Sequence, residues 1–225
     1  MRDTPIKPVW VLLILWAMLV LSSIPTRSFI PIDETRYVTV AWTMWLSGDY
    51  LVPWLNGEPY HHKPPLLFWL INLGWAVFGV NETWPRVLPA LFSLACAFLL
   101  RRLGQLLWPQ RREVAESAPL ILMASLLWAI FTTATMFDIM LTSFVLTGLC
   151  GLVMAGRNPD NARVGFVLLA LALGGGLLAK GPVVLIHLLL PAAVAPWWAP
   201  AWGNTRTKKS PSNNPFLLYK YLDPD

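Results

Sequence analysis

The chain is poor in charged residues. Asp, Glu, Lys and Arg together make up 13% of its 225 residues, about half their share in an ordinary soluble domain. Hydrophobic residues account for 56%, and the mean hydropathy is +0.55. They occur in blocks of roughly 16 to 21 residues, the length of a helix that crosses a bilayer. The composition therefore argues against a soluble protein and predicts an all-α, polytopic membrane helical bundle.

Cysteine is almost absent as well. Cys96 and Cys150 each lie inside an apolar run, as expected of small buried hydrophobic residues and not of a disulfide or a metal pair. The net charge of +5 does not indicate nucleic-acid binding, because Lys and Arg fall between the apolar blocks and no aromatic–basic motif is present. The 13 Trp residues are typical of membrane interfaces.

The apolar runs cover residues 8–25, 66–80, 87–107, 117–136, 138–156, 164–179 and 182–199. If all of them crossed the membrane, the basic cluster between residues 101 and 112 would face outward, against the positive-inside rule. The run 66–80 is short for a span and follows Pro64-Pro65, so we expect it to lie in the outer interface. About six spans remain, with both termini cytoplasmic and the loop 26–86 outside.

The chain changes character after Trp202. Residues 203–225 are rich in Asn, Lys, Ser and Pro, a composition typical of a disordered tail. We therefore expect a membrane module over residues 1–202 and a polar cytoplasmic tail over 203–225.

Charged residues of both signs gather on the outer side of this topology. Most basic residues face the cytoplasm, but charged residues of both signs fall at or near the outer face, among them Asp33, Glu34, Arg36, Lys63, Arg86, Asp138 and Lys180. Charged side chains at a membrane surface are energetically costly unless they are paired or take part in function. Their coincidence predicts a single outward-facing polar site.

The first acidic pair, Asp33-Glu34, opens a segment that resembles an interfacial helix reaching Leu46. Asp33, Arg36 and Tyr37 share one face at its start. One interpretation makes Asp33 the helix N-cap, with both acids complementing the helix dipole. Because two carboxylates are more than a cap requires, the other interpretation is a catalytic base or a metal ligand.

A second cluster follows in Tyr60-His61-His62-Lys63-Pro64-Pro65. Two imidazoles and an ammonium held by prolines form a compact site for phosphate or metal. A solvated basic loop is the alternative. The preceding stretches 48–54 and 56–59 have the Gly, Asn and Pro of turns.

Asp138 and Lys180 each lie at the edge of an apolar run, and Arg86 precedes another. Helix capping is an alternative for Asp138, and snorkelling of the side chain is one for Lys180. The three cations Lys63, Arg86 and Lys180 on this side are suited to neutralising a leaving phosphate. Asp33 is then the group that deprotonates or orients an acceptor, and Asp138 helps to position it.

The blocks that carry these residues stand in a characteristic order: Asp33-Glu34-x-Arg36-Tyr37, Gly48-Asp49-Tyr50-x-x-Pro53, Gly57-x-Pro59-Tyr60, Lys63-Pro64-Pro65-Leu66, Arg86-x-x-Pro89-Ala90, Asp138 and Ala179-Lys180-Gly181-Pro182. In this order, over about residues 8–200, the chain resembles the aminoarabinose transferases that modify lipid A. These are GT-C glycosyltransferases related to the protein O-mannosyltransferases.

The resemblance implies a multi-pass enzyme of the bacterial inner membrane with a periplasmic active site. Its partners would be a polyprenyl-phosphate sugar donor and a lipid A, lipopolysaccharide-type or other acceptor, with no nucleic acid, and its chemistry a single inverting displacement. The catalytic residues that it implies are Asp33, Asp138 and Glu34. Substrate-binding residues would be Lys63, Arg86, Lys180, Tyr60, His62 and Arg36.

No cofactor is firmly implied. Some relatives carry Glu where this chain has His62, so a divalent metal is left open, with His61 and His62 as weak candidate ligands. Family members are longer, with further spans and a periplasmic C-terminal domain, whereas this chain leaves the pattern near Trp202. We therefore expect a truncated member of the family. The alternative is a non-catalytic membrane fragment or lipid-phosphate-binding protein without the C-terminal half.

Overall fold

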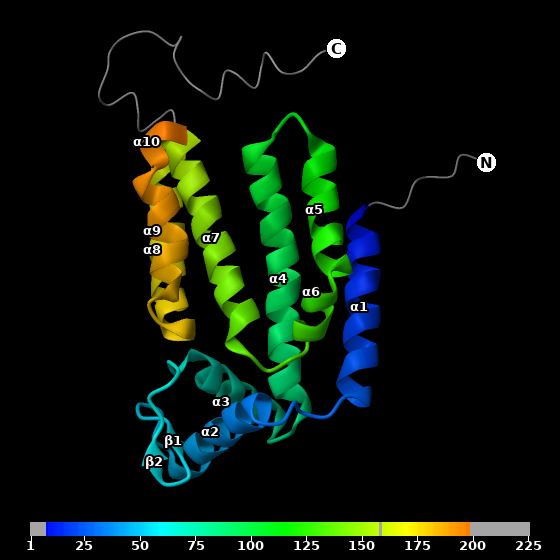
Figure 1. The fold of residues 1–225 in the computed structure, drawn as a ribbon, viewed down its shortest axis with the longest axis vertical. Helices are drawn as coiled ribbons and strands as arrows, with labels where there is room; N and C mark the ends of the chain where they lie inside the picture. Colours follow the sequence, from blue (N-terminus) through cyan, green and yellow to red (C-terminus); the bar gives the residue numbers. More distant parts are fainter. Residues whose placement is uncertain (1–7, 158, 199–225) are drawn as a thin grey trace, which may run out of the picture.

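The chain folds into a bundle of helices that lie side by side, with a small cap at one end (Figure 1). The computed structural model describes residues 8–157 and 159–198. In the order α8, α7, α4, α5 and α1, neighbouring helices pack against one another across the bundle (Figure 1). The predicted tail 203–225 lies outside the described residues.

Within the described ranges, four helices are long and apolar enough to cross a membrane. They are α1 (Pro8–Thr26), α4 (Thr83–Leu107), α7 (Phe137–Arg157) and α8 (Ala162–Lys180). Many of their apolar side chains point away from the bundle, which suits contact with lipid. The chain is thus a polytopic membrane protein, as predicted.

The other two expected spans are interrupted. The run 117–136 divides into α5 (Arg112–Ala124) and α6 (Leu126–Phe131), because Ser125 has an extended backbone with φ −69° and ψ 128°. The run 182–199 divides into α9 (Val183–Ala193) and α10 (Ala195–Trp198). It follows α8, which the short 3₁₀ turn η1 (Pro159–Asn161) joins to α7. The broken pairs still run alongside α4 and α8 (Figure 1). The count of six spans stays a prediction.

Helices α7 and α8 form the closest pair of the bundle. A Cβ atom added to Gly151 would lie 2.5 Å from the carbonyl oxygen of Gly165, so the two backbones touch where both residues lack a side chain. Because α7 and α8 run in opposite directions, the end of α8 lies beside the beginning of α7.

The cap consists of two short helices and a hairpin (Figure 1). Helix α2 (Asp33–Ser47) is followed by β1 (Trp54–Leu55), β2 (Glu58–Pro59) and α3 (Leu66–Phe78). Positive φ angles at Asn56 (54°) and Gly57 (84°) form the hairpin turn, in a stretch for which the sequence predicted turns but no strands. The 13 residues of α3 reach only about 20 Å, and α3 lies at the end of the bundle, consistent with an interfacial helix.

Aromatic and aliphatic side chains fix this cap to the bundle. Tyr37 and Met44 of α2, Phe68 of α3 and Phe137 of α7 belong to one buried cluster. The rings of Tyr37 and Phe137 meet edge to face, with centroids 4.9 Å apart. Helix α2 is therefore docked directly on the start of α7.

Candidate functional site

The predicted charged residues do gather at the capped end. Asp33, Glu34 and Arg36 lie in the first turns of α2, Lys63 just before α3, and Arg86 near the start of α4. Asp138 lies in the first turn of α7, and Lys180 is the last residue of α8. The structure divides them into an exposed group and a buried group.

Asp138 and Lys180 form an ion pair between α7 and α8. Helix α8 stops there because Gly181 takes a φ of 77°, which few other residues adopt. The Nζ atom of Lys63 lies 5.9 Å from the ring centre of Phe137, the neighbour of Asp138. Two ammonium groups therefore converge on the start of α7, where they suit a phosphate that gains charge during a reaction.

The side chain of Asp33, at the start of α2, is 42% exposed, and its carboxylate lies 2.6 Å from a guanidinium nitrogen of Arg36. The prediction that Asp33 caps the helix is wrong. The N-cap residue is Ile32, with no side-chain cap, and Asp33 is the first helical residue. Its carboxylate is free of backbone partners in the described structure and is open to a ligand.

Arg36 forms the side of a pocket of ≈ 420 Å³, lined also by Leu55, Asn56, Glu58, Pro59, Tyr60, His61 and His62. Tyr60 is buried, and its hydroxyl has no hydrogen-bond partner among the described residues. Burial raises the pKa of Tyr60, and nearby Arg36 partly opposes this effect. The phenol of Tyr60, the amide of Asn56 and the guanidinium of Arg36 can together hydrogen-bond a polyhydroxylated ligand.

The two weak candidate metal ligands stack on each other. The rings of His61 and His62 have centroids 4.9 Å apart, and His62 also stacks on Tyr60 at 5.4 Å. In the ranges 8–157 and 159–198, no three His, Cys, Asp or Glu side chains group around one point. The described residues do not by themselves make a metal site.

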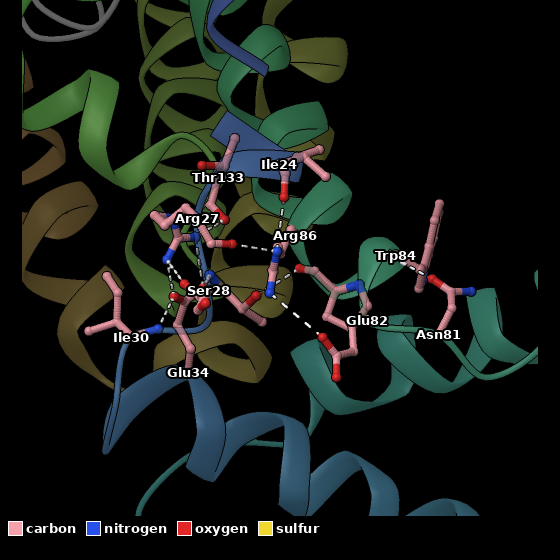
Figure 2. A network of polar contacts seen from close by, with 12 residues as sticks. Ile24, Arg27, Ser28, Ile30, Glu34, Asn81, Glu82, Trp84, Arg86 and Thr133 are labelled. Atoms are coloured by element: carbon pink, nitrogen blue, oxygen red, sulfur yellow. Dashed lines mark hydrogen bonds and ion pairs between the residues drawn. The ribbon is translucent and has the colours of Figure 1, made fainter. Parts of the chain in front are cut away.

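Glu34 occupies a different environment from Asp33. Its side chain is fully buried, and its two oxygens accept bonds from Arg27 and from the Ile30 amide at 2.7 Å (Figure 2). They also accept from the Thr135 amide at 2.5 Å. Burial favours a raised pKa, but the bonds from Arg27 and the two amides outweigh it and lower the pKa of Glu34. Glu34 is thus a buried carboxylate with both oxygens occupied.

Arg86 is also turned away from the exposed group. It is 8% exposed and donates to the carbonyl oxygens of Ile24 at 3.0 Å and Arg27 at 2.7 Å (Figure 2). Its guanidinium carbon lies 4.1 Å from the ring centre of Phe29. Arg86 therefore holds the end of α1 and does not join Lys63 and Lys180.

The fold has known counterparts. A family profile described as dolichyl-phosphate-mannose-protein mannosyltransferase matches residues 9–222. The chain belongs to this family. Among curated proteins, it is similar to an undecaprenyl phosphate-alpha-4-amino-4-deoxy-L-arabinose arabinosyl transferase of Erwinia tasmaniensis, with 30% identity over 186 residues. A second relative, of Pseudomonas fluorescens and with the same described activity, is 33% identical over 165 residues.

The chain shares its fold with a solved structure of ArnT from Cupriavidus metallidurans, bound to undecaprenyl phosphate. The TM-score is 0.72 and the identity 26%, over 88% of this chain and 36% of that one. The curated relatives show the same disparity in length. The matches cover 81% and 72% of this chain, but 33% and 28% of the relatives. The chain therefore spans about a third of the length of the relatives that it matches.

One important residue of this family member escaped the sequence-based site. Arg27 pairs with Glu34 and donates to the carbonyl oxygen of Thr133 at 2.7 Å. Its only signal in the sequence was that it is one of the few basic residues on the predicted outer side. The backbone amides of Ile30 and Thr135 gave no signal, since any residue but proline carries one.

Proposed function

We propose that this chain carries the donor-phosphate site and the acceptor-activating carboxylate of a GT-C glycosyltransferase. The observation that carries the proposal is the convergence of Lys63 and the Asp138–Lys180 pair on the start of α7, at the same end of the bundle as exposed Asp33. Membership in the mannosyltransferase family supports it. So does the shared fold with a protein solved in complex with undecaprenyl phosphate.

The reaction is a single displacement at the sugar's anomeric carbon. An acceptor oxygen attacks that carbon and gives its proton to Asp33, while the bond from the carbon to the donor phosphate breaks. The polyprenyl phosphate leaves with the bonding electron pair, and Lys63 and Lys180 neutralise its added charge. Asp138 keeps Lys180 in place and helps to position the acceptor.

The pocket at Arg36, Tyr60 and His62 is assigned to the saccharide part of a substrate. Its polar groups lie next to Asp33 through the Asp33–Arg36 pair. The names of the relatives favour an aminoarabinose-type sugar on undecaprenyl phosphate. We propose a lipid A, lipopolysaccharide-type or other periplasmic acceptor.

The capped end is proposed to face the periplasm, with the protein in the bacterial inner membrane. Arg101, Arg102, Arg111 and Arg112 lie at or near the opposite end of α4 and the start of α5. Because basic residues favour the cytoplasmic side, this distribution supports the orientation. The membrane module is proposed to extend over residues 1–202, followed by a polar tail over 203–225.

A second candidate function is binding of a lipid phosphate without sugar transfer. It is favoured by the pairing of both exposed acids, Asp33 with Arg36 and Asp138 with Lys180, which withdraws them from an acceptor.

A transfer assay separates the two functions. Membranes containing the full chain are incubated with a labelled polyprenyl-phosphate sugar and a lipid extract as acceptor. Labelled product that is lost with Asp33→Asn supports the glycosyltransferase. Saturable binding of polyprenyl phosphate without product supports the second candidate. Absence of both binding and transfer overturns the proposal.

A further inference from the structure

One buried carboxylate holds together the segments that carry the two exposed acids. Oε2 of Glu34 accepts from Arg27 and from the amide of Ile30 (Figure 2). Oε1 accepts from the amide of Thr135 at 2.5 Å and from Arg27 at 3.2 Å. Glu34 therefore joins α2 to the connection after α1 and to the connection between α6 and α7.

These connections lead directly to the proposed reacting groups. Asp33 precedes Glu34 on α2, and Asp138 follows Thr135 by three residues on α7. One helical turn further along α2, Tyr37 packs on Phe137. The separation between Asp33 and the Asp138–Lys180 pair is thus set where Glu34 meets Thr135.

Two arginines anchor this junction to the long helices. Arg27 donates to the carbonyl oxygen of Thr133, and Arg86 of α4 donates to the carbonyl oxygen of Arg27. The hydroxyl of Thr135 donates to the carbonyl oxygen of Pro85, also in α4, at 3.0 Å. Buried ion pairs often add little to stability over apolar packing, and in some proteins they specify geometry instead.

The backbone beside Asp33 depends on this junction. Ile32 has a φ of 76°, which is unfavourable for a β-branched residue and persists only where the surroundings impose it. Its side chain is 74% exposed, so its own packing does not hold it. The bond from the Ile30 amide to Glu34 closes the turn around Ile32.

We propose that Glu34 is a positioning residue that, together with Arg27, fixes Asp33 of α2 relative to Asp138 and Lys180. Glu34 does not touch substrate. It acts through Asp33, and to that extent its role rests on the proposed function. The geometric part of the proposal, the fixed placement of α2 on α7, stands apart from catalysis.

The test measures geometry and turnover in the same full-length chain in lipid. Spin labels are attached to cysteines introduced at Thr39 on the exposed side of α2 and at Val183 at the start of α9. The native Cys96 and Cys150 are buried. Distances between the labels are compared in the wild type, in Glu34→Gln and in Glu34→Asp, which keeps the charge but shortens the side chain. Glu113→Gln, exposed at the far end of the bundle, is the matched control.

We expect a single narrow distance in the wild type and control, and a broadened or shifted one in both Glu34 variants. Turnover should fall about a hundredfold, the scale of a 1 Å misplacement, with an unchanged KM for the donor because Lys63 and Lys180 are untouched. A wild-type distance together with wild-type turnover in Glu34→Gln overturns the proposal.

The outcomes separate this inference from the proposed function. If the wild type transfers no sugar, the proposed function fails, while the distances still decide whether Glu34 places α2. If Glu34→Gln does not accumulate in the membrane, the label distance and the turnover are both measured in Glu34→Asp. A narrow wild-type distance in Glu34→Asp then counts against positioning.

Discussion

Lys180 and Asp138, 42 residues apart in the chain, form an ion pair that joins the last residue of α8 to the first turn of α7. Asp138 is 52% exposed and Lys180 is 24% exposed, so both remain within reach of a ligand. A phosphate that approaches Lys180 must compete with the carboxylate already there. The pair therefore has opposite consequences for binding and for transfer.

The first prediction concerns this competition. Asp138→Asn removes the anion that competes for Lys180, so binding of undecaprenyl phosphate should become tighter. The gain should be modest, up to about fivefold, because exposed pairs contribute only about 0.2–1 kcal/mol. Transfer should nevertheless fall, since the acceptor loses a positioning group. Equilibrium binding and turnover of the same preparation check both directions, and weaker phosphate binding by the variant would contradict this account of the pair.

The second prediction concerns Lys63. Lys63→Ala should weaken binding of undecaprenyl phosphate roughly ten- to a hundredfold, as expected when a charge-assisted contact of about 1.5–3 kcal/mol is lost. The wild type should bind the matching polyprenyl alcohol more weakly than the phosphate. Arg163→Ala, exposed at the start of α8 on the other end, is the control. Equal affinity of the wild type for phosphate and alcohol would refute phosphate recognition.

Much of the fold follows from the apolar runs. Four of them became the long helices α1, α4, α7 and α8, and the short run 66–80 became the helix α3 of the cap. The interruption at Ser125 did not follow, because the sequence around it is as apolar as a continuous span. Tertiary contacts decide there: Trp128 donates to Ser93 of α4, and Thr132 also contacts Ser93.

The gathering of the charged residues at one end of the bundle was predictable from the sequence, but their division into exposed and buried groups was not. Consecutive helical residues point about 100° apart, so Asp33 and Glu34 face opposite environments once α2 is docked. The sequence does not say which of the two faces inward. The sequence likewise predicted Arg86 to be a free cation. It binds carbonyl oxygens at the end of α1, and backbone groups of this kind cannot be recognised from the order of side chains.

The third prediction tests the topology. Single cysteines at Asn56 and Glu82 should both react with a membrane-impermeant maleimide in intact spheroplasts, because α3 lies in the outer interface between them. A cysteine at Gln110, beyond the far end of α4, should react only after permeabilisation. Glu82 is 81% exposed, so its protection would result from the membrane and not from burial. Protection at Glu82 with labelling at Asn56 would mean that α3 spans.

The fourth prediction concerns acid stability. The pKa of Glu34 is lowered from its usual value of 4.5, so the folded state binds this proton less readily than the unfolded state. Its stabilising contribution is present above pH 4.5 and is lost as the pH falls through the lowered value. The Tm of the wild type in detergent should therefore decrease below about pH 4.5.

Glu34→Gln should flatten this part of the acid profile. At neutral pH the free energy of unfolding of the variant should be lower by about 3 kcal/mol, the low end of the range for breaking a buried ion pair. The low end applies because Arg27 is 24% exposed. Asp49→Asn is the control: the pKa of Asp49 is also lowered, by the amides of Val52 and Leu51, but among the described residues its half-buried carboxylate bonds only to those of its own turn. An acid profile of Glu34→Gln that parallels the wild type would exclude Glu34 as a source of the dependence.

The last prediction separates a structural Asp33 from a catalytic one. Asp33→Asn keeps the size of the side chain and an oxygen that can accept from Arg36, and Asp33 does not cap the helix. The substitution therefore removes charge and basicity and little else. Turnover should fall by about a hundredfold or more, the scale of general-base catalysis, while membrane levels and undecaprenyl phosphate binding stay normal. Asp49→Asn, the same change elsewhere in the same loop, should leave turnover intact. Near wild-type transfer by a well-expressed Asp33→Asn variant would show that the base lies elsewhere.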